Sequence, residues 1–152
     1  QLRISVAQAQ ALMDDYFSRF GRVRTYLDSL VQEARKEGYT QTILGRRRYL
    51  PDLNSTNRQA REAAERMALN APIQGSAADI VKLAMVAVVD SMKGMRSRVL
   101  LQVHDELVLE IAPGEREAVE AIVRREMENA VELAVPLSVG IGVGSSWREA
   151  AH

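Results

Sequence analysis

The feature that most constrains the fold is an apolar stretch around residue 100, broken by a polar pair at its centre. Two short apolar runs separated by two residues predict an antiparallel hairpin, with strands over 99–103 and 106–111. Adjacent residues on an extended strand point to opposite faces. Asp105 and Glu106 therefore cannot both aim at one ion in regular strand geometry. Asp105, at the tip of the hairpin, is the better candidate for a metal ligand.

The spacing alone leaves another interpretation of this hairpin open. Asp is common in turns for local hydrogen-bonding reasons, so a turn that is polar only for solubility has the same pattern. The pair His104-Asp105 also lacks the glycine that two-residue turns prefer. The missing glycine suggests a turn shaped for a purpose, but the residues by themselves do not decide between these two interpretations.

The composition limits the kind of metal that the chain could bind. The 152 residues contain no Cys and two His, which excludes thiolate sites and makes an all-histidine zinc site a poor fit. Carboxylates must then be the main ligands, and they favour a hard cation such as Mg²⁺. No apolar run of roughly 18 residues occurs, so we expect no membrane-spanning segment and no membrane partner.

The net charge of zero hides a difference between the two halves of the chain. Residues 1–76 carry twelve Lys and Arg against eight Asp and Glu, and residues 77–152 carry eight against twelve. Six of the first twelve are arginines between Arg46 and Arg66. This asymmetry suggests an anionic partner bound by the first half. A chance distribution of solvated charges is the alternative.

The first seventy residues have the pattern of two helices followed by a hairpin and a third helix. Ser5 to Gln8 has the form of a capping box, and Gly21 separates the first helix from a second over 22–37. We expect a small hairpin or irregular loop over 39–50 and a helix over 58–70 that ends near Pro72.

The rest of the chain is expected to contain a long helix followed by a β-β-α-β arrangement. The long helix should span 76–92, and the hairpin should be followed by a helix over 113–133 and a final strand over 135–143. The order of helices and then strands predicts an α+β fold: a mainly helical part, then a β-β-α-β portion with an antiparallel sheet.

Basic and amide side chains gather between residues 46 and 74. Arg46 to Arg48 form a short cluster, for which a solvated loop is the alternative. Arg66 and Asn70 are four residues apart and therefore neighbours on a helix, and Gln74 follows. Arg side chains suit phosphates, and amides suit the acceptors of the minor groove, which are nearly independent of sequence. This combination predicts a surface for duplex DNA.

Four segments resemble the family A DNA polymerases, the group of the bacterial polymerase I enzymes. They are Leu44-Gly-Arg-Arg-Arg-Tyr-Leu-Pro-Asp-Leu53, the run from Arg61 to Ile80, Gln102-Val-His-Asp-Glu-Leu-Val-Leu-Glu110 and Val139-Gly-Ile-Gly-Val-Gly144. The segments occur in the order of the family and the resemblance covers essentially the whole chain. The third segment is similar to motif C of that family.

The resemblance implies a role for each matched residue of the hairpin. Asp105 resembles the aspartate that coordinates two catalytic Mg²⁺ ions, and Glu106 resembles its more peripheral neighbour. His104 resembles the residue that touches the primer terminus on its minor-groove side, and Gln102 should lie near the same duplex end.

The resemblance also implies DNA contacts in the first half of the chain. Arg66, Asn70 and Gln74 match positions that lie along the primer-template and the nascent base pair. Arg48 is the contact that we favour in the basic loop. The implied reaction is template-directed addition of dNTPs to a primer 3′ end in DNA replication and repair, and the implied location is the bacterial cytoplasm, at the nucleoid.

Parts that the family needs for catalysis are not found in these residues. The chain shows no motif A aspartate, which would share the two ions, and no helix with the Arg, Lys and Tyr that grip the nucleotide. We therefore expect a piece of a longer polymerase that begins just after that helix and needs the remaining polymerase domains for activity. Residues 1–95 would form the later fingers with the basic loop and connecting helices, and 96–152 the C-terminal palm portion. A non-catalytic DNA-binding or structural fragment is the alternative.

Overall fold

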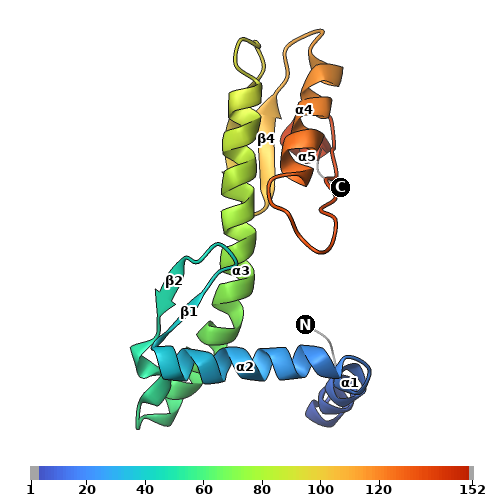
Figure 1. Ribbon diagram of the computed structural model, residues 1–152. Coiled ribbons are helices and arrows are strands. Elements are labelled where there is room, and N and C mark those ends of the chain that lie inside the picture. The colour runs from blue at the N-terminus through green and yellow to red at the C-terminus, as the bar shows by residue number, and fades with distance from the viewer. Residues whose placement is uncertain (1–3, 151–152) are drawn as a thin grey trace. The chain divides into compact units, whose positions relative to one another are not determined.

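The computed structural model describes residues 4–150, which form two compact units that divide between Gly75 and Ser76. Helices and two small antiparallel sheets make up the described structure (Figure 1). The α+β class expected from the sequence is therefore confirmed. The expected division of the chain into a fingers part, residues 1–95, and a palm part, residues 96–152, stays a prediction.

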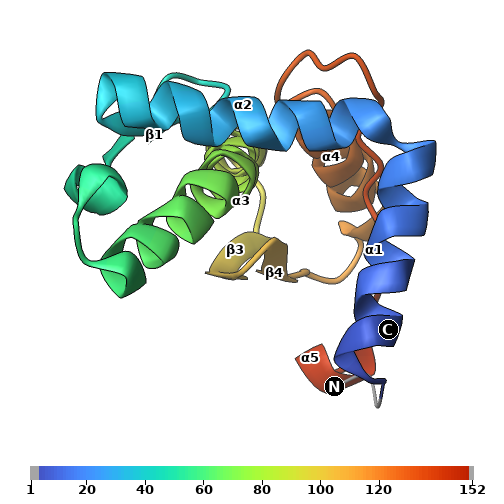
Figure 2. The ribbon, with the colours of Figure 1, turned by 90° about the horizontal axis from the view of Figure 1, so that it is seen from below.

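The first unit begins with two helices, α1 (Val6–Arg19) and α2 (Gly21–Glu37), that meet at an angle at Phe20 (Figure 2). The expected capping box is present, because the Ser5 hydroxyl accepts from the Gln8 amide while the Gln8 side chain accepts from the Ser5 amide. Gly38 ends α2 at φ 78°, a left-handed conformation that favours glycine.

The hairpin expected over 39–50 is also confirmed. Strands β1 (Tyr39–Gln41) and β2 (Arg47–Tyr49) pair in antiparallel register, with Thr40 opposite Arg48. A short 3₁₀ helix, η1 (Pro51–Asn54), leads from the hairpin towards the next helix. The core of this unit is a cluster of small and branched side chains from α2, the end of the hairpin, η1 and the following helix: Ala34, Leu50, Leu53, Ala64 and Ala68.

The helix α3 (Arg58–Ser91) corrects one prediction. Asn57 caps its first turn by accepting from the Gln59 amide at 2.9 Å. The helix then continues through Pro72, whereas the sequence predicted two helices separated there. Proline removes one backbone hydrogen bond and disfavours a helical residue before it. Burial of helix side chains on both sides of the proline outweighs that local preference.

The length of α3 bears on the expectation about membranes. By length and composition alone this one helix could cross a membrane, which the sequence reasoning missed because it ended the helix at Pro72. One such helix is weak evidence, since a core helix of a globular domain passes the same test. Ala68 contributes to the core of the first unit and Val88 to the core of the second.

The second unit contains the predicted hairpin, β3 (Arg98–Val103) and β4 (Glu106–Glu110). Its core joins the second half of α3, one face of this sheet and the helix α4 (Arg116–Glu128) (Figure 1). The register shifts by one residue between Val99 and Leu101, so β3 contains a bulge. The short helix α5 (Trp147–Ala150) follows near the end of the described chain.

Two elements of the second unit differ from the prediction. The helix expected over 113–133 is shorter, because Gly114 at φ 86° forms a turn before it and Asn129 caps its end. The segment 135–143, expected as a strand, is not one. Side chains of α4 bind both backbone groups of Val139, whose amide donates to Glu128 and whose carbonyl accepts from Arg124. These bonds replace those that a partner strand would supply.

Candidate nucleic-acid groove and carboxylate hairpin

Four of the eight predicted site residues line one groove of the first unit. The groove has a volume of about 390 Å³ and lies between β2 and the first half of α3. We call it the Arg48 groove; its lining residues are Arg48, Ala63, Arg66, Met67, Asn70, Ala71 and Gln74. All four predicted DNA contacts from the first half of the chain are therefore brought together, and their role in DNA binding stays a prediction.

The helix period explains the α3 side of the groove. Arg66, Asn70 and Gln74 follow one another at intervals of four residues, so they form one row along α3, and all three are exposed. From β2, the guanidinium of Arg48 reaches across to the helix and donates to Met67 Sδ at 3.3 Å. Met67 packs against the core of this unit, and it also lines the groove.

The groove is electrostatically basic because nearby carboxylates are engaged elsewhere. Glu62 accepts from Arg58 at 2.6 Å, and Glu65 accepts from Arg35 of α2. Both glutamates are therefore paired with arginines outside the groove lining. Within residues 4–150, neither Arg48 nor Arg66 forms an ion pair. The groove can therefore offer two guanidinium groups and two amides to an anionic, hydrogen-bonding partner.

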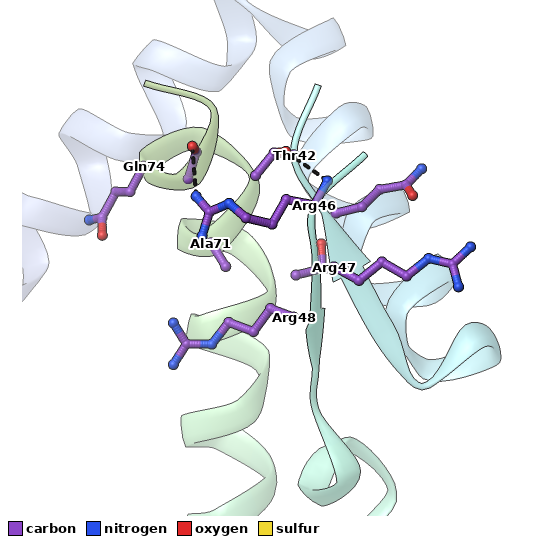
Figure 3. Close-up of a pocket in the computed structure, with 9 residues that line it drawn as sticks. Thr42, Arg46, Arg47, Arg48, Ala71 and Gln74 are labelled. Carbon is purple, nitrogen blue, oxygen red and sulfur yellow. Dashed lines mark hydrogen bonds between the residues drawn. The ribbon is translucent and has the colours of Figure 1, made fainter. Parts of the chain in front are cut away.

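The three consecutive arginines of the basic loop have three different environments (Figure 3). Arg46 points to α3, where its guanidinium donates to the Gly75 carbonyl at 3.1 Å. Arg47 points away from α3 and lies over the ring of Tyr39, 4.4 Å from its centroid. Arg48 lies in the groove. In the sequence the three arginines form one cluster. The pairing of β1 with β2 directs their side chains to different faces of the hairpin.

The other four predicted site residues belong to the second unit, at the tip of the β3–β4 hairpin. His104 and Asp105 form the two-residue turn, and Val103 pairs with Glu106 across it. His104 has φ 53°, the one positive φ outside glycine among residues 4–150. Both turn types that suit a two-residue hairpin require a positive φ at this first position. Gln102 supports the turn by donating to the His104 carbonyl at 3.0 Å.

The carboxylates at this tip are the right type of ligand for a hard cation, but two of them are too few for a complete site. Asp105 and Glu106 are both exposed, and carboxylate oxygens are the ligands that Mg²⁺ prefers. Within the described residues, no group of three or more His, Cys, Asp and Glu side chains could hold a metal ion. The hairpin can therefore contribute at most two ligands to a site, with the remaining ligands supplied from elsewhere.

The opposite end of the same hairpin is fixed by a cluster that the sequence reasoning missed. Glu115 accepts from the Ser97 hydroxyl at 2.6 Å, from the Ser97 amide at 2.9 Å and from the Arg96 amide at 3.1 Å. These hydrogen bonds, that of the Ser97 hydroxyl most of all, lower the pKa of Glu115 to about 2. Ser97 also accepts from the Ala112 amide at 2.9 Å, so the two chain ends of the hairpin are tied together.

Comparison with known proteins gives a consistent family. A sequence model of "DNA polymerase family A" matches residues 1–149. The chain is 62% identical over 154 aligned residues to DNA polymerase I of Mycobacterium leprae, which covers 100% of this chain and 17% of that protein. It is 50% identical to the thermostable DNA polymerase I of Thermus aquaticus, covering 99% of this chain and 18% of that protein.

A solved structure shows the same fold. The polymerase domain of Pol1 from M. smegmatis, in complex with DNA primer-template and dNTP, superposes with a TM-score of 0.95 at 60% sequence identity. The match covers 100% of this chain and 27% of that one. The chain thus spans less than a fifth of the length of these curated relatives and about a quarter of the matched structure.

Proposed function

The chain belongs to DNA polymerase family A, and from this premise we propose that it forms part of a template-directed DNA polymerase that extends a primer 3′ end with dNTPs. The observation that carries the proposal is the convergence of Arg48, Arg66, Asn70 and Gln74 in one basic groove. The relative from M. smegmatis binds primer-template and dNTP, which supports the same partners for the protein that contains this chain.

The groove is suited to duplex DNA of any sequence. Arg48 and Arg66 can bind phosphates, and the amides of Asn70 and Gln74 can donate to minor-groove acceptors. Those acceptors are nearly the same for every base pair, which a polymerase requires. Such binding fixes the position of the duplex without reading its sequence. Because DNA is the proposed substrate, we expect the protein at the nucleoid, in the cytoplasm of a bacterial cell.

The hairpin tip is proposed as part of the reaction centre. Asp105 would hold Mg²⁺ as a direct ligand, and Glu106 would contribute from a more peripheral position. Two Mg²⁺ ions, when bound, activate the primer hydroxyl and neutralise charge on the triphosphate. His104 would contact the primer terminus on its minor-groove side, and Gln102 would lie near the same duplex end. Because the described residues supply only these two carboxylates at the tip, a further aspartate from the longer polymerase would complete the ion site.

The decisive experiment replaces Asp105 by Asn in the full-length polymerase. We expect primer extension to be lost, because an amide is a poor ligand for Mg²⁺, while primer-template affinity stays within about twofold of wild type, since no phosphate contact is removed. Asp90→Asn is the matched control, because Asp90, in the last turn of α3, pairs locally with Lys93 just beyond the helix. Extension by Asp105→Asn at the wild-type rate would favour the alternative of a non-catalytic DNA-binding fragment.

A further inference from the structure

Gly75 lies in the interior of α3, where glycine is the least favourable residue apart from proline. Its position next to the β1–β2 hairpin explains this choice. A Cβ at residue 75 would lie 2.7 Å from Cγ2 of Thr42, closer than real side chains approach one another. The hairpin loop and the helix backbone therefore touch at this point, and only glycine permits the approach.

Thr42 cannot easily move aside to make room. Its hydroxyl accepts from the Arg46 amide at 3.1 Å, and its own amide donates to the Arg46 carbonyl at 2.9 Å. Its carbonyl accepts from the Gly45 amide at 2.9 Å. Rotating the side chain to remove Cγ2 would break the bond to the hydroxyl. Thr42 is also only 7% exposed, so neighbouring atoms oppose the rotation.

Arg46 adds a second contact across the same interface. Its guanidinium donates to the Gly75 carbonyl at 3.1 Å, as the dashed line in Figure 3 shows. The loop residue that holds Thr42 is thus itself bound to the helix residue that Thr42 contacts. We call Thr42, Arg46 and Gly75 the hairpin joint.

The position of the joint relates it to the Arg48 groove. Arg48 follows Arg46 by two residues, so both side chains lie on the face of the hairpin that is turned to α3 (Figure 3). Ala71 and Gln74 line the groove, and they also line the small pocket that contains the joint. The joint contacts both the hairpin and α3 next to the groove, where the separation of β2 from α3 determines where the Arg48 guanidinium lies.

We propose that Thr42, Arg46 and Gly75 are positioning residues that hold Arg48 in place for the DNA backbone, and that Arg46 serves this joint instead of contacting DNA. The inference rests on the proposed function of the groove. A different reason for a glycine would be close approach of DNA to the bare helix backbone. The two explanations differ in whether shortening Thr42 can compensate for a larger residue 75.

The test uses three variants of the full-length polymerase: Gly75→Ala, Thr42→Ser and both together. Serine retains the hydroxyl and lacks Cγ2, so it removes the atom that the new Cβ would meet. We expect Gly75→Ala to weaken primer-template binding about five-fold at roughly 0.15 M salt and to lower the salt slope by about one, as for one lost phosphate contact. Thr42→Ser alone should bind within about twofold of wild type, and the double variant should recover that affinity.

Two further measurements distinguish the role of the joint from DNA binding by the groove. Hydrogen exchange of the Arg46 amide without DNA should be faster in Gly75→Ala and return to the Thr42→Ser rate in the double variant. Arg46→Ala should weaken binding in the wild-type background and have little further effect when Arg48 is already Ala, because Arg46 acts through Arg48.

The outcomes test the positioning role of the joint and the DNA-binding role of the Arg48 groove separately. The positioning role of the joint is wrong if the double variant binds primer-template as weakly as Gly75→Ala does. It is also wrong if Gly75→Ala binds primer-template as well as wild type. If Arg46→Ala weakens binding equally with and without Arg48, Arg46 contacts DNA directly and its assignment to the joint is wrong. If Arg48→Ala itself leaves DNA binding unchanged, the proposed function of the groove fails, and the positioning role fails with it, even where the exchange rates still respond to Gly75→Ala.

Discussion

Arg47 and Arg48 are consecutive on β2, yet their guanidinium groups lie on opposite faces of the β1–β2 hairpin (Figure 3). Arg48 faces α3 and donates to Met67 Sδ at 3.3 Å. Arg47 faces away and lies 4.4 Å from the centroid of the Tyr39 ring. The pair is therefore an internal control: two equal charges, one residue apart, of which one lies in the proposed DNA groove.

Arg48→Ala is expected to weaken primer-template binding by the full-length polymerase. Loss of one phosphate contact should lower the affinity about five-fold at roughly 0.15 M salt and reduce the slope of log K against log salt by about one. The loss should be the same for primer-templates of different sequence, because phosphates carry no sequence information. Fluorescence anisotropy over a series of salt concentrations measures both quantities.

Arg47→Ala is the matched control for that measurement. It removes the same charge and leaves the groove intact, so we expect a change in affinity of less than about twofold. Equal losses in the two variants would show that only the net charge of the hairpin matters, and would argue against the groove as the place where DNA binds.

Local sequence signals predicted much of the fold. The capping box at Ser5, the end of the second helix at residue 37 and the two-residue turn at His104 each depend on neighbouring residues, and each is present. The signals that misled the prediction were also local. Pro72 is an expected helix end, but α3 continues through it, with side chains buried on either side.

The segment 135–143 shows the same limit. Its alternating apolar residues predicted a strand, and Val139 and Ile141 do pack into the core as such a strand would. A strand also needs a partner backbone, which no local pattern reveals. Here Arg124 and Glu128 of α4 bind the backbone of Val139 instead.

The candidate site was predictable where its spacing is regular. The row of Arg66, Asn70 and Gln74 follows from the helix period alone. The contact between Thr42 and Gly75 joins residues 33 positions apart, and its one local sign is a glycine inside a helix. The cluster of Ser97 and Glu115 gave no sign, because Ser and Glu are common surface residues.

The Ser97–Glu115 cluster predicts a pH dependence of local stability. The pKa of Glu115 is lowered from 4.5 to about 2, so its hydrogen bonds stabilise the folded state fully above pH 4.5. That stabilisation is lost as the pH falls through about 2. In Glu115→Gln, the protection of the Ser97 amide from hydrogen exchange should be lower than in wild type above pH 4.5. Between pH 4.5 and about 2 it should also depend less on pH than in wild type.

The control for this prediction is Glu117→Gln, which removes a carboxylate from the first turn of the same helix. It should leave the protection of the Ser97 amide and its pH dependence as in wild type, because Glu117 takes no part in the cluster. A Glu115→Gln variant with an unchanged pH profile would show that Glu115 does not supply the charge that holds the hairpin ends.

Arg124 is predicted to hold the segment 135–143 on α4. Its guanidinium donates to the Val139 carbonyl at 3.0 Å and lies 3.8 Å from Glu128. Arg124→Ala should lower the local stability at the Val139 amide by about 1 kcal/mol, as expected for one charge-assisted hydrogen bond that is partly exposed. Hydrogen exchange of the full-length protein measures this value.

Arg116→Ala serves as the comparison on α4. Arg116 forms the same kind of i,i+4 pair, with Glu120 at 2.7 Å, but neither residue binds the segment 135–143. We expect this variant to leave exchange at Val139 unchanged. If both variants accelerate that exchange equally, the segment responds to the stability of α4 as a whole and not to the contact of Arg124.

His104→Gly should separate the stability of the hairpin turn from its function. The positive φ of 53° is unfavourable for a residue with a side chain, so glycine should stabilise the turn by about 1 kcal/mol, measured by hydrogen exchange of the Glu106 amide. If His104 contacts the primer terminus, the same variant should extend primers more slowly, although its hairpin is more stable. His104→Asn keeps a polar side chain and tolerates the left-handed conformation, so its extension rate should lie between those of glycine and histidine. Glycine has no imidazole. A glycine variant that is both more stable and fully active would therefore show that His104 has no role at the primer.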